Sequence, residues 1–199
     1  MPHDDRVQRL HEPHVAQLTE LVRLIRKNTD RGADVPFFDP ADGGVNARVL
    51  FLFESPGPGA VKSGFVSREN PDGTARNFRE LNEAAGLDRT ETVSWNLVPW
   101  FIGTGGEKDR VIRSKDTISA ARYLEALIPL LPRLAAIVLV GSNTWSEEAF
   151  VRSAAPSVEI FTCPMPSPLW VNRDREANRD RILRILRSVR DFLDKGVRR

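Results

Sequence analysis

Cysteine and histidine are scarce in this chain and lie where they can do little chemistry. The 199 residues include one cysteine, Cys163, and three histidines, His3, His11 and His14. A single cysteine forms no internal disulfide and supplies no four-thiolate zinc or iron–sulfur cluster. Histidines confined to the N-terminal stretch are poor candidates for a catalytic triad or a metal site. We therefore expect no metal and no cofactor.

Long apolar runs are also missing. None approaches the roughly 20 residues that span a bilayer, so we expect no contact with a membrane. The first residues lack the basic and then apolar pattern of a secretory signal, and we expect a cytoplasmic protein. Hydrophobic residues make up 41% and charged residues 28%, which is typical of a globular protein. The length predicts a single domain over 1–199, with a monomer as the simplest expectation.

Four short runs rich in β-branched and aromatic residues predict buried strands, over 48–53, 92–97, 136–140 and 158–162. Helical patterns lie over 14–27, 76–85, 117–131, 144–153 and 174–194, whereas 28–46 has the composition of a loop. Strands that alternate with helices indicate a parallel sheet covered on both faces. The sequence therefore predicts an α/β fold, a three-layer α/β/α sandwich with a central four-stranded parallel sheet. Its core spans 48–173, between the N-terminal helix 14–27 and the C-terminal helix 174–194.

The segments that follow the four strands carry the unusual residues. They are Glu54–Gly59, Asn96–Trp100, Gly141–Thr144 and Pro164–Trp170. Ligands of parallel α/β sheets bind in the crevice outside the carboxyl ends of the strands, so these segments are the candidate site. The glycines near position 57 do not match a nucleotide-binding fingerprint, because Lys62 and Phe65 occupy key positions of the two common patterns.

In order, these segments resemble the motifs of the uracil-DNA glycosylase superfamily, from about Val49 to Arg173. Leu52–Gly57 is similar to the first motif, a strand that runs into an acidic residue and a Pro-Gly turn, in the version found in the iron–sulfur branch. Trp95–Val98 is similar to the segment whose asparagine reads uracil. Val140–Asn143 resembles a Gly-Ser-His segment, and Met165–Leu169 matches the second motif, HPSPL, except at its first residue.

That first residue, Met165, is the main departure from the family pattern. The family has a histidine there, which stabilises the departing uracil anion, and a methionine donates no hydrogen bond. The chain also lacks the cysteines that accompany its version of the first motif. If the protein is an active enzyme, it stabilises the leaving base without that histidine.

The resemblance implies catalytic roles for two residues. Asn96 would accept a hydrogen bond from uracil N3–H and donate one to O4, a pattern that cytosine does not match. Glu54 would position the attacking water and offset positive charge on the sugar. Each residue also has a purely structural alternative. Asn96 would cap the turn at Pro99, and Glu54 would pair with a neighbouring arginine or loop amide.

Further residues would hold the base. Main-chain N–H groups from Ser55 to Gly59, with Ser55 and Gly57 as named candidates, would contact uracil O2, and Met165 would lie beside the base. Phe65 is the stacking candidate, with Phe78 as the alternative, and ordinary core packing is the competing interpretation for Phe65.

Contact with DNA requires phosphate ligands and an apolar wedge. Leu169 or Trp170 fits the wedge, unless the pair packs back on the core. The candidate phosphate contacts are Ser142, Asn143, Ser167 and Arg173. The loop Gly103–Lys108 is either a segment that closes over DNA or a bare connection. Most arginines of the C-terminal helix fit a solvated amphipathic face.

The sequence thus predicts a monofunctional DNA repair glycosylase that acts in base excision repair. Its partner is uracil-containing DNA, single- or double-stranded, and its products are free uracil and an abasic site. Two alternatives stay open: a weak or inactive protein that binds lesions or abasic DNA, and a glycosylase for another damaged base.

Overall fold

The computed structural model describes residues 5–103 and 114–197. Residues 104–108 of the loop Gly103–Lys108, for which both DNA closure and a bare connection were open, lie outside it. Its centre is a four-stranded parallel sheet in the order β4-β2-β5-β6. These strands are β2 (Val49–Phe53), β4 (Thr92–Asn96), β5 (Ala136–Val140) and β6 (Glu159–Cys163). The predicted four-stranded parallel sheet is confirmed, with each strand within one residue of its expected start or end.

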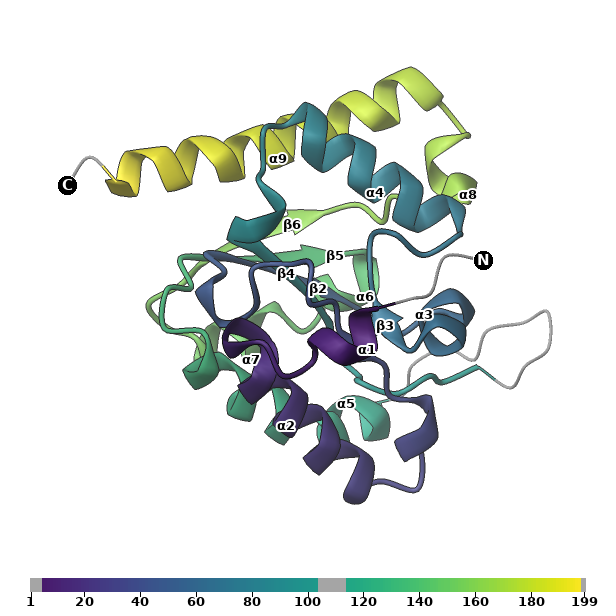
Figure 1. Ribbon diagram of the computed structural model, residues 1–199. Coiled ribbons are helices and arrows are strands. Elements are labelled where there is room, and N and C mark those ends of the chain that lie inside the picture. Colours follow the sequence, from purple (N-terminus) through teal and green to yellow (C-terminus); the bar gives the residue numbers. More distant parts are fainter. Residues whose placement is uncertain (1–4, 104–113, 198–199) are drawn as a thin grey trace.

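Helices cover both faces of this sheet (Figure 1). α4 (Gly73–Ala84) and α9 (Arg175–Val197) lie on one face. α2 (Pro13–Lys27), α5 (Ser114–Leu127) and α7 (Glu148–Ala154) lie on the other. Each face buries its own apolar cluster against the sheet, so the predicted three-layer α/β/α sandwich is confirmed. Within 5–103 and 114–197, no helix is long and apolar enough to cross a membrane.

The edge strand β4 has a polar face inside the protein. Side chains alternate between the two faces of a strand, so Thr92, Ser94 and Asn96 share one face while Val93 and Trp95 share the other. Trp95 stacks on Phe38, with ring centroids 3.8 Å apart. All five residues of β4 are buried. A buried strand with three polar side chains on one face needs partners for them, and this need shapes the site described below.

The region 28–46 is more regular than the predicted loop. β1 (Phe37–Phe38) pairs in parallel with β3 (Phe65–Val66) as a separate two-stranded sheet. Two-residue strands give no periodic pattern, which explains why they escape a reading of the sequence. The predicted helix 144–153 is in fact two, α6 (Ser142–Trp145) and α7. The remaining short helices are α1 (Arg6–Arg9), α3 (Pro58–Ser63), α8 (Pro168–Val171) and the 3-10 turns at Gly32–Asp34, Gly44–Asn46, Arg89–Glu91 and Ile128–Leu130.

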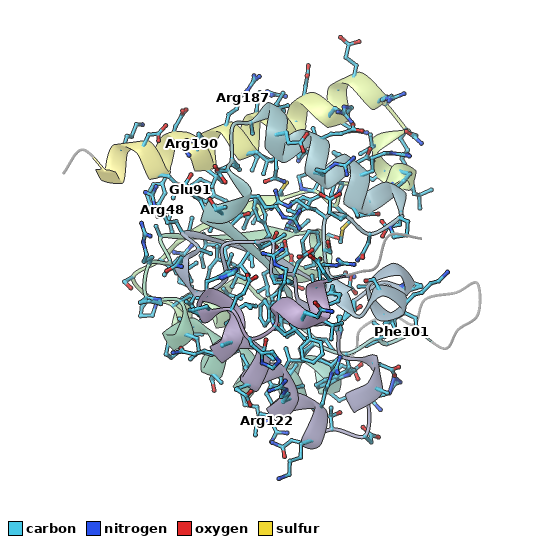
Figure 2. The ribbon with its side chains drawn as sticks, viewed as in Figure 1. Arg48, Glu91, Phe101, Arg122, Arg187 and Arg190 are labelled. Atoms are coloured by element: carbon cyan, nitrogen blue, oxygen red, sulfur yellow. The ribbon has the colours of Figure 1, made fainter. Side chains whose placement is uncertain are left out.

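An ionic link ties α9 to the amino-terminal end of the sheet (Figure 2). Glu91, just before β4, accepts hydrogen bonds from Arg48 at 2.9 Å and from Arg190 at 2.6 Å. Arg48 also donates to the carbonyl oxygen of Leu193 at 2.8 Å. Isoleucine, leucine and valine side chains three or four residues apart form the buried stripe of α9. This link lies at the amino-terminal end of the sheet, so it does not cover the carboxyl ends of the strands.

Candidate active site

A pocket of about 510 Å³ opens at the carboxyl ends of β2 and β4. Its lining comes from Phe53 and the loop that follows β2, from the turn between β3 and α4, from the first turns of α4, and from Ser94 and Asn96 of β4. Met165, from the loop after β6, completes it. This is the crevice where parallel α/β sheets bind ligands.

The loop after β2 presents main-chain donors to this pocket. Gly57 is extended and precedes Pro58, which starts α3. Within the described part of the chain, the N–H groups of Ser55 and Gly57 have no acceptor in the protein. Both residues line the pocket. α3 ends at Gly64, whose left-handed conformation, with φ of +79°, favours glycine.

Asn96 lies at the end of β4, with 3% of its surface exposed. The bonds from Leu97 N to Phe53 O and from Val98 N to Glu54 O extend the strand pairing past it and hold it at the pocket. Its side-chain Nδ2 is buried and has no hydrogen-bond partner. A buried donor without an acceptor lowers the stability of the folded state by about 1–3 kcal/mol. A ligand that accepts a hydrogen bond from this amide would remove that cost. A bond that would cap the Pro99 turn is not observed in the described residues.

Other pocket residues share this property. Ser94 Oγ, Asn70 Oδ1 and Arg68 Nε are all buried without a hydrogen-bond partner. Ser94 lies on β4 with Asn96, whereas Arg68 and Asn70 lie in the turn between β3 and α4. All three residues line the pocket beside Asn96. Buried polar atoms normally find partners, and four unmet ones around one pocket indicate a polar ligand.

Comparisons with known proteins identify the family of this chain. The family model of the uracil DNA glycosylase superfamily matches residues 40–187. The chain belongs to the uracil DNA glycosylase superfamily. The search of curated proteins gives no match. The family assignment agrees with the resemblance drawn from the motifs.

Two solved structures of superfamily type share the fold. Pedobacter heparinus SMUG2 is 12% identical, with a TM-score of 0.58, over 90% of this chain and 85% of that one. A candidate uracil DNA glycosylase from Methanosarcina acetivorans is 16% identical, with a TM-score of 0.50, over 73% of this chain and 92% of that one. At such identities the likeness concerns the fold.

Glu54, the expected carboxylate of the first motif, is half-buried and lies in the chain between Phe53 and Ser55, which both line the pocket. Glu54 itself does not belong to the lining. In the described residues its carboxylate has no ion-pair partner, so the alternative of a structural pair with an arginine is not observed. Its backbone carbonyl accepts from Val98 N at 3.0 Å, which fixes the main chain there.

The stacking candidates separate clearly. Phe65 is buried outside the pocket lining, where Arg6 lies over its ring at 4.4 Å from the centroid and Phe37 packs beside it. Phe78, the alternative, lines the pocket. Its ring packs edge-on against Phe51 and Phe53. The position of Phe65 after Gly64 therefore does not bring its ring to the pocket, because the ring packs against Arg6 and Phe37.

The second-motif segment forms the short helix α8. Met165 is half-buried and lines the pocket. The hydroxyl of Ser167 accepts from Trp170 N and caps this helix. Trp170 is partly buried against the core, whereas Leu169 is 76% exposed. Of the two wedge candidates, Leu169 alone stands free of the core.

The remaining DNA candidates lie on the surface. Ser142 and Asn143 are exposed at the start of α6, directly after β5. Arg173 is exposed between α8 and α9. Within the ranges 5–103 and 114–197, no three histidine, cysteine or acidic side chains gather as metal ligands would.

A buried ion cluster lies behind the pocket and was not foreseen from the sequence. Arg89 donates to Asp42 at 2.8 Å and to Asp39 at 2.9 Å. Arg68 Nε stands 3.9 Å from the Asp42 carboxylate. Burial raises the pKa of Asp42 to about 6 despite the two arginines, and burial lowers the pKa of Arg68. Arg68 connects this cluster to the pocket, because it also belongs to the lining.

The alternating pattern of β4 is the sequence feature that could have indicated a covered polar face with partners such as Arg68. Thr92, Ser94 and Asn96 alternate with apolar residues, a pattern that usually marks an exposed face. Here the face is covered, and Arg68 donates to Thr92 Oγ1 at 2.7 Å. Only the tertiary structure brings Arg68 and Asn70 to this strand.

Proposed function

We propose that this superfamily member is a monofunctional DNA glycosylase that hydrolyses the N-glycosidic bond of flipped-out uracil. The observation that carries the proposal is the buried, unpartnered amide of Asn96 at the pocket. An asparagine side chain offers one acceptor and two donors, which match uracil N3–H and O4. Cytosine presents the opposite pattern at these positions. Extrusion of the base, at a cost of a few kcal/mol, brings it within reach of this amide.

The proposed chemistry needs a polarised water and a supported leaving group. Glu54 orients water toward the C1′ carbon of the sugar and offsets its positive charge in the transition state. The unpaired N–H groups of Ser55 and Gly57 donate to uracil O2. Phe78 supplies an aromatic wall in place of Phe65. These steps leave free uracil and an abasic site.

Contact with DNA is proposed for the surface beside the pocket. Leu169 fills the gap that the extruded nucleotide leaves, because a free, exposed leucine on a rigid turn suits insertion between bases. Ser142, Asn143 and Arg173 contact phosphates there. Ser167 contributes mainly through its main chain, since its hydroxyl already caps α8.

A uracil-containing oligonucleotide and alkaline strand cleavage test the proposal. The unsubstituted chain should cleave, whereas Asn96→Ala and Glu54→Gln should each slow single-turnover excision about 100-fold or more. Asn82→Ala is the matched control, because Asn82 is fully buried on α4 and outside the pocket. Normal rates for Asn96→Ala and Glu54→Gln would refute the assigned roles.

Met165 favours a second candidate function, a protein that binds lesions or abasic DNA without turnover. Its thioether gives the pocket no donor for a leaving base. This candidate predicts salt-dependent binding of uracil duplexes with no cleavage above background. Cleavage of another damaged base, with uracil left intact, would favour the remaining alternative of a different substrate.

A further inference from the structure

Arg68 is a buried cation at the pocket that the proposed mechanism has not used. It lies in the turn between β3 and α4 and is 4% exposed. It belongs to the pocket lining together with Ser94, Asn96 and Phe78. A charged side chain is almost never buried to this degree without a full set of partners.

The hydrogen bonds of Arg68 are incomplete. Its Nη2 donates to Thr92 Oγ1 at 2.7 Å, and this is the one hydrogen bond that the described residues give its guanidinium. Its Nε lies 3.9 Å from Asp42, beyond hydrogen-bond distance. The guanidinium therefore keeps donors for an acceptor that enters the pocket.

The charges behind the pocket also leave Arg68 poorly neutralised. Asp42 is engaged by Arg89 at 2.8 Å, and Asp39 is engaged by Arg89 at 2.9 Å and by Arg6 at 3.3 Å. The two buried carboxylates thus face three arginines, of which Arg89 also pairs with the more exposed Glu69 at 3.1 Å. The pKa of Arg68 stays below its ordinary value because burial outweighs the attraction of Asp42. An anion in the pocket would be attracted to Arg68, whose guanidinium has no carboxylate within hydrogen-bond distance among the described residues.

The surroundings strengthen that attraction. Phe78 lies beneath the guanidinium, with its ring centroid 5.2 Å from the central carbon, and Phe53 packs on the same ring. Apolar rings exclude water, and a charge interaction in such a setting is several times stronger than in bulk solvent. A fixed cation that faces developing negative charge is the arrangement that lowers a transition state.

We propose that Arg68 stabilises the negative charge on the departing base, the task that the missing histidine performs elsewhere in the superfamily. The inference rests on the proposed glycosylase function. As the water oxygen bonds to C1′, the C1′–N1 bond breaks and its electron pair passes to the base, where it spreads over the carbonyl oxygens. Arg68 donates to one of these oxygens, the water proton leaves through Glu54, and the base anion takes a proton from solvent.

The leaving-group dependence of excision tests this role. Single-turnover excision of uracil and of 5-fluorouracil is measured from the same duplex with the full chain. Fluorine withdraws charge, so the 5-fluorouracil anion needs less help. Arg68→Gln should slow uracil excision about 100-fold and 5-fluorouracil excision only about 10-fold. Arg68→Lys keeps the charge, so its rate of uracil excision should lie between those of Arg68→Gln and the unsubstituted chain.

Arg89→Gln serves as the control, because it disrupts the same ion cluster from outside the pocket lining. It should change the two bases by the same factor. Equal slowing of both bases by Arg68→Gln, or no slowing, would overturn the role of Arg68 while the glycosylase function stands. If Arg68→Gln fails to fold, as judged by circular dichroism, the comparison of bases with Arg68→Lys decides in the same way. No excision of either base by the unsubstituted chain would overturn the proposed function itself.

Discussion

At the scale of single residues, burial decides which side chains are reactive. Asn96 and Arg68 are buried against a pocket and keep unmet donors, while Cys163 and Asp42 are buried within the structure. The first pair is available to a ligand that enters the pocket. The second pair is withdrawn from solvent, and its titration should report on the integrity of the fold.

The thiol of Cys163 should be inert in the native protein. Burial raises its pKa to about 12, so almost no thiolate exists at neutral pH. We expect no reaction with an aromatic disulfide reagent at pH 8 in the native state and one equivalent after unfolding in guanidinium chloride. Rapid stoichiometric labelling of the native protein would contradict the buried position of Cys163 at the end of β6.

The carboxyl group of Asp42 should make stability depend on pH in an unusual direction. Its pKa is 3.8 in the unfolded chain and about 6 when folded. Between these values the folded state retains a proton that the unfolded state has released, so this contribution to the unfolding free energy falls as pH rises from about 4 to 6. The loss is on the order of 3 kcal/mol and persists above pH 6.

Asp42→Asn isolates this effect. The unfolding free energy of the unsubstituted protein minus that of the variant, from urea titrations at several pH values, should fall between pH 4 and pH 6 and be level above. Asp191→Asn, at an exposed position of α9, is the control and should run parallel to the unsubstituted protein. Parallel curves for Asp42→Asn as well would contradict the raised pKa.

At the scale of elements, short helices after the strands place the candidate DNA contacts. α8 begins at Pro168, is capped by Ser167, and packs Trp170 inward, which turns Leu169 outward. Of the two wedge candidates from the sequence, this four-residue helix therefore exposes Leu169 and buries part of Trp170.

Removal of the Leu169 side chain should impair excision without harming the fold. Leu169→Ala removes an exposed side chain, so the midpoint of thermal unfolding should hardly change, while uracil excision from duplex DNA falls about tenfold. Ile118→Ala is a matched control, since Ile118 is 75% exposed on α5, in the other helical layer. Equal excision rates for the two variants would argue against Leu169 as the wedge.

The sequence predicted the elements of the sheet well because their signals are local. Runs such as Val49–Phe53 and Ala136–Val140 are apolar, short and bounded by turns, which suffices to find a buried strand. The sequence predicts Asn96 and Met165 near one site because Asn96 lies at the end of a strand and Met165 lies just after another. The contacts of Phe65 with Arg6 and of Arg68 with Thr92 join distant segments, and no local pattern encodes them.

At the scale of the whole molecule, the sheet separates a binding end from an anchoring end. The pocket and the exposed residues Ser142, Leu169 and Arg173 follow the carboxyl ends of the strands, whereas the link among Arg48, Glu91 and Arg190 ties α9 to their amino ends (Figure 2). A net charge of only +2 gives little general attraction for DNA. Affinity should therefore come from local contacts at the binding end.

The salt dependence of DNA binding should show this localisation. Arg173→Ala should lower the slope of log affinity against log salt concentration by about 1, because one phosphate contact is lost. Arg187 lies at an exposed position of α9, about 20 Å along the helix from the Arg173 end. Arg187→Ala should therefore leave the slope unchanged. Binding curves over a salt series would measure both, and an unchanged slope for Arg173→Ala would remove it from the interface.

The most direct test of the central claim, that Asn96 reads uracil in this pocket, is the ratio of uracil to cytosine excision. In the unsubstituted protein this ratio should be very large. In Asn96→Asp, a carboxyl group can accept from cytosine N4–H and, when protonated, donate to N3, so the ratio should fall by about 100-fold. Cytosine rejection that remains unchanged in Asn96→Asp, with uracil still excised, would contradict the account.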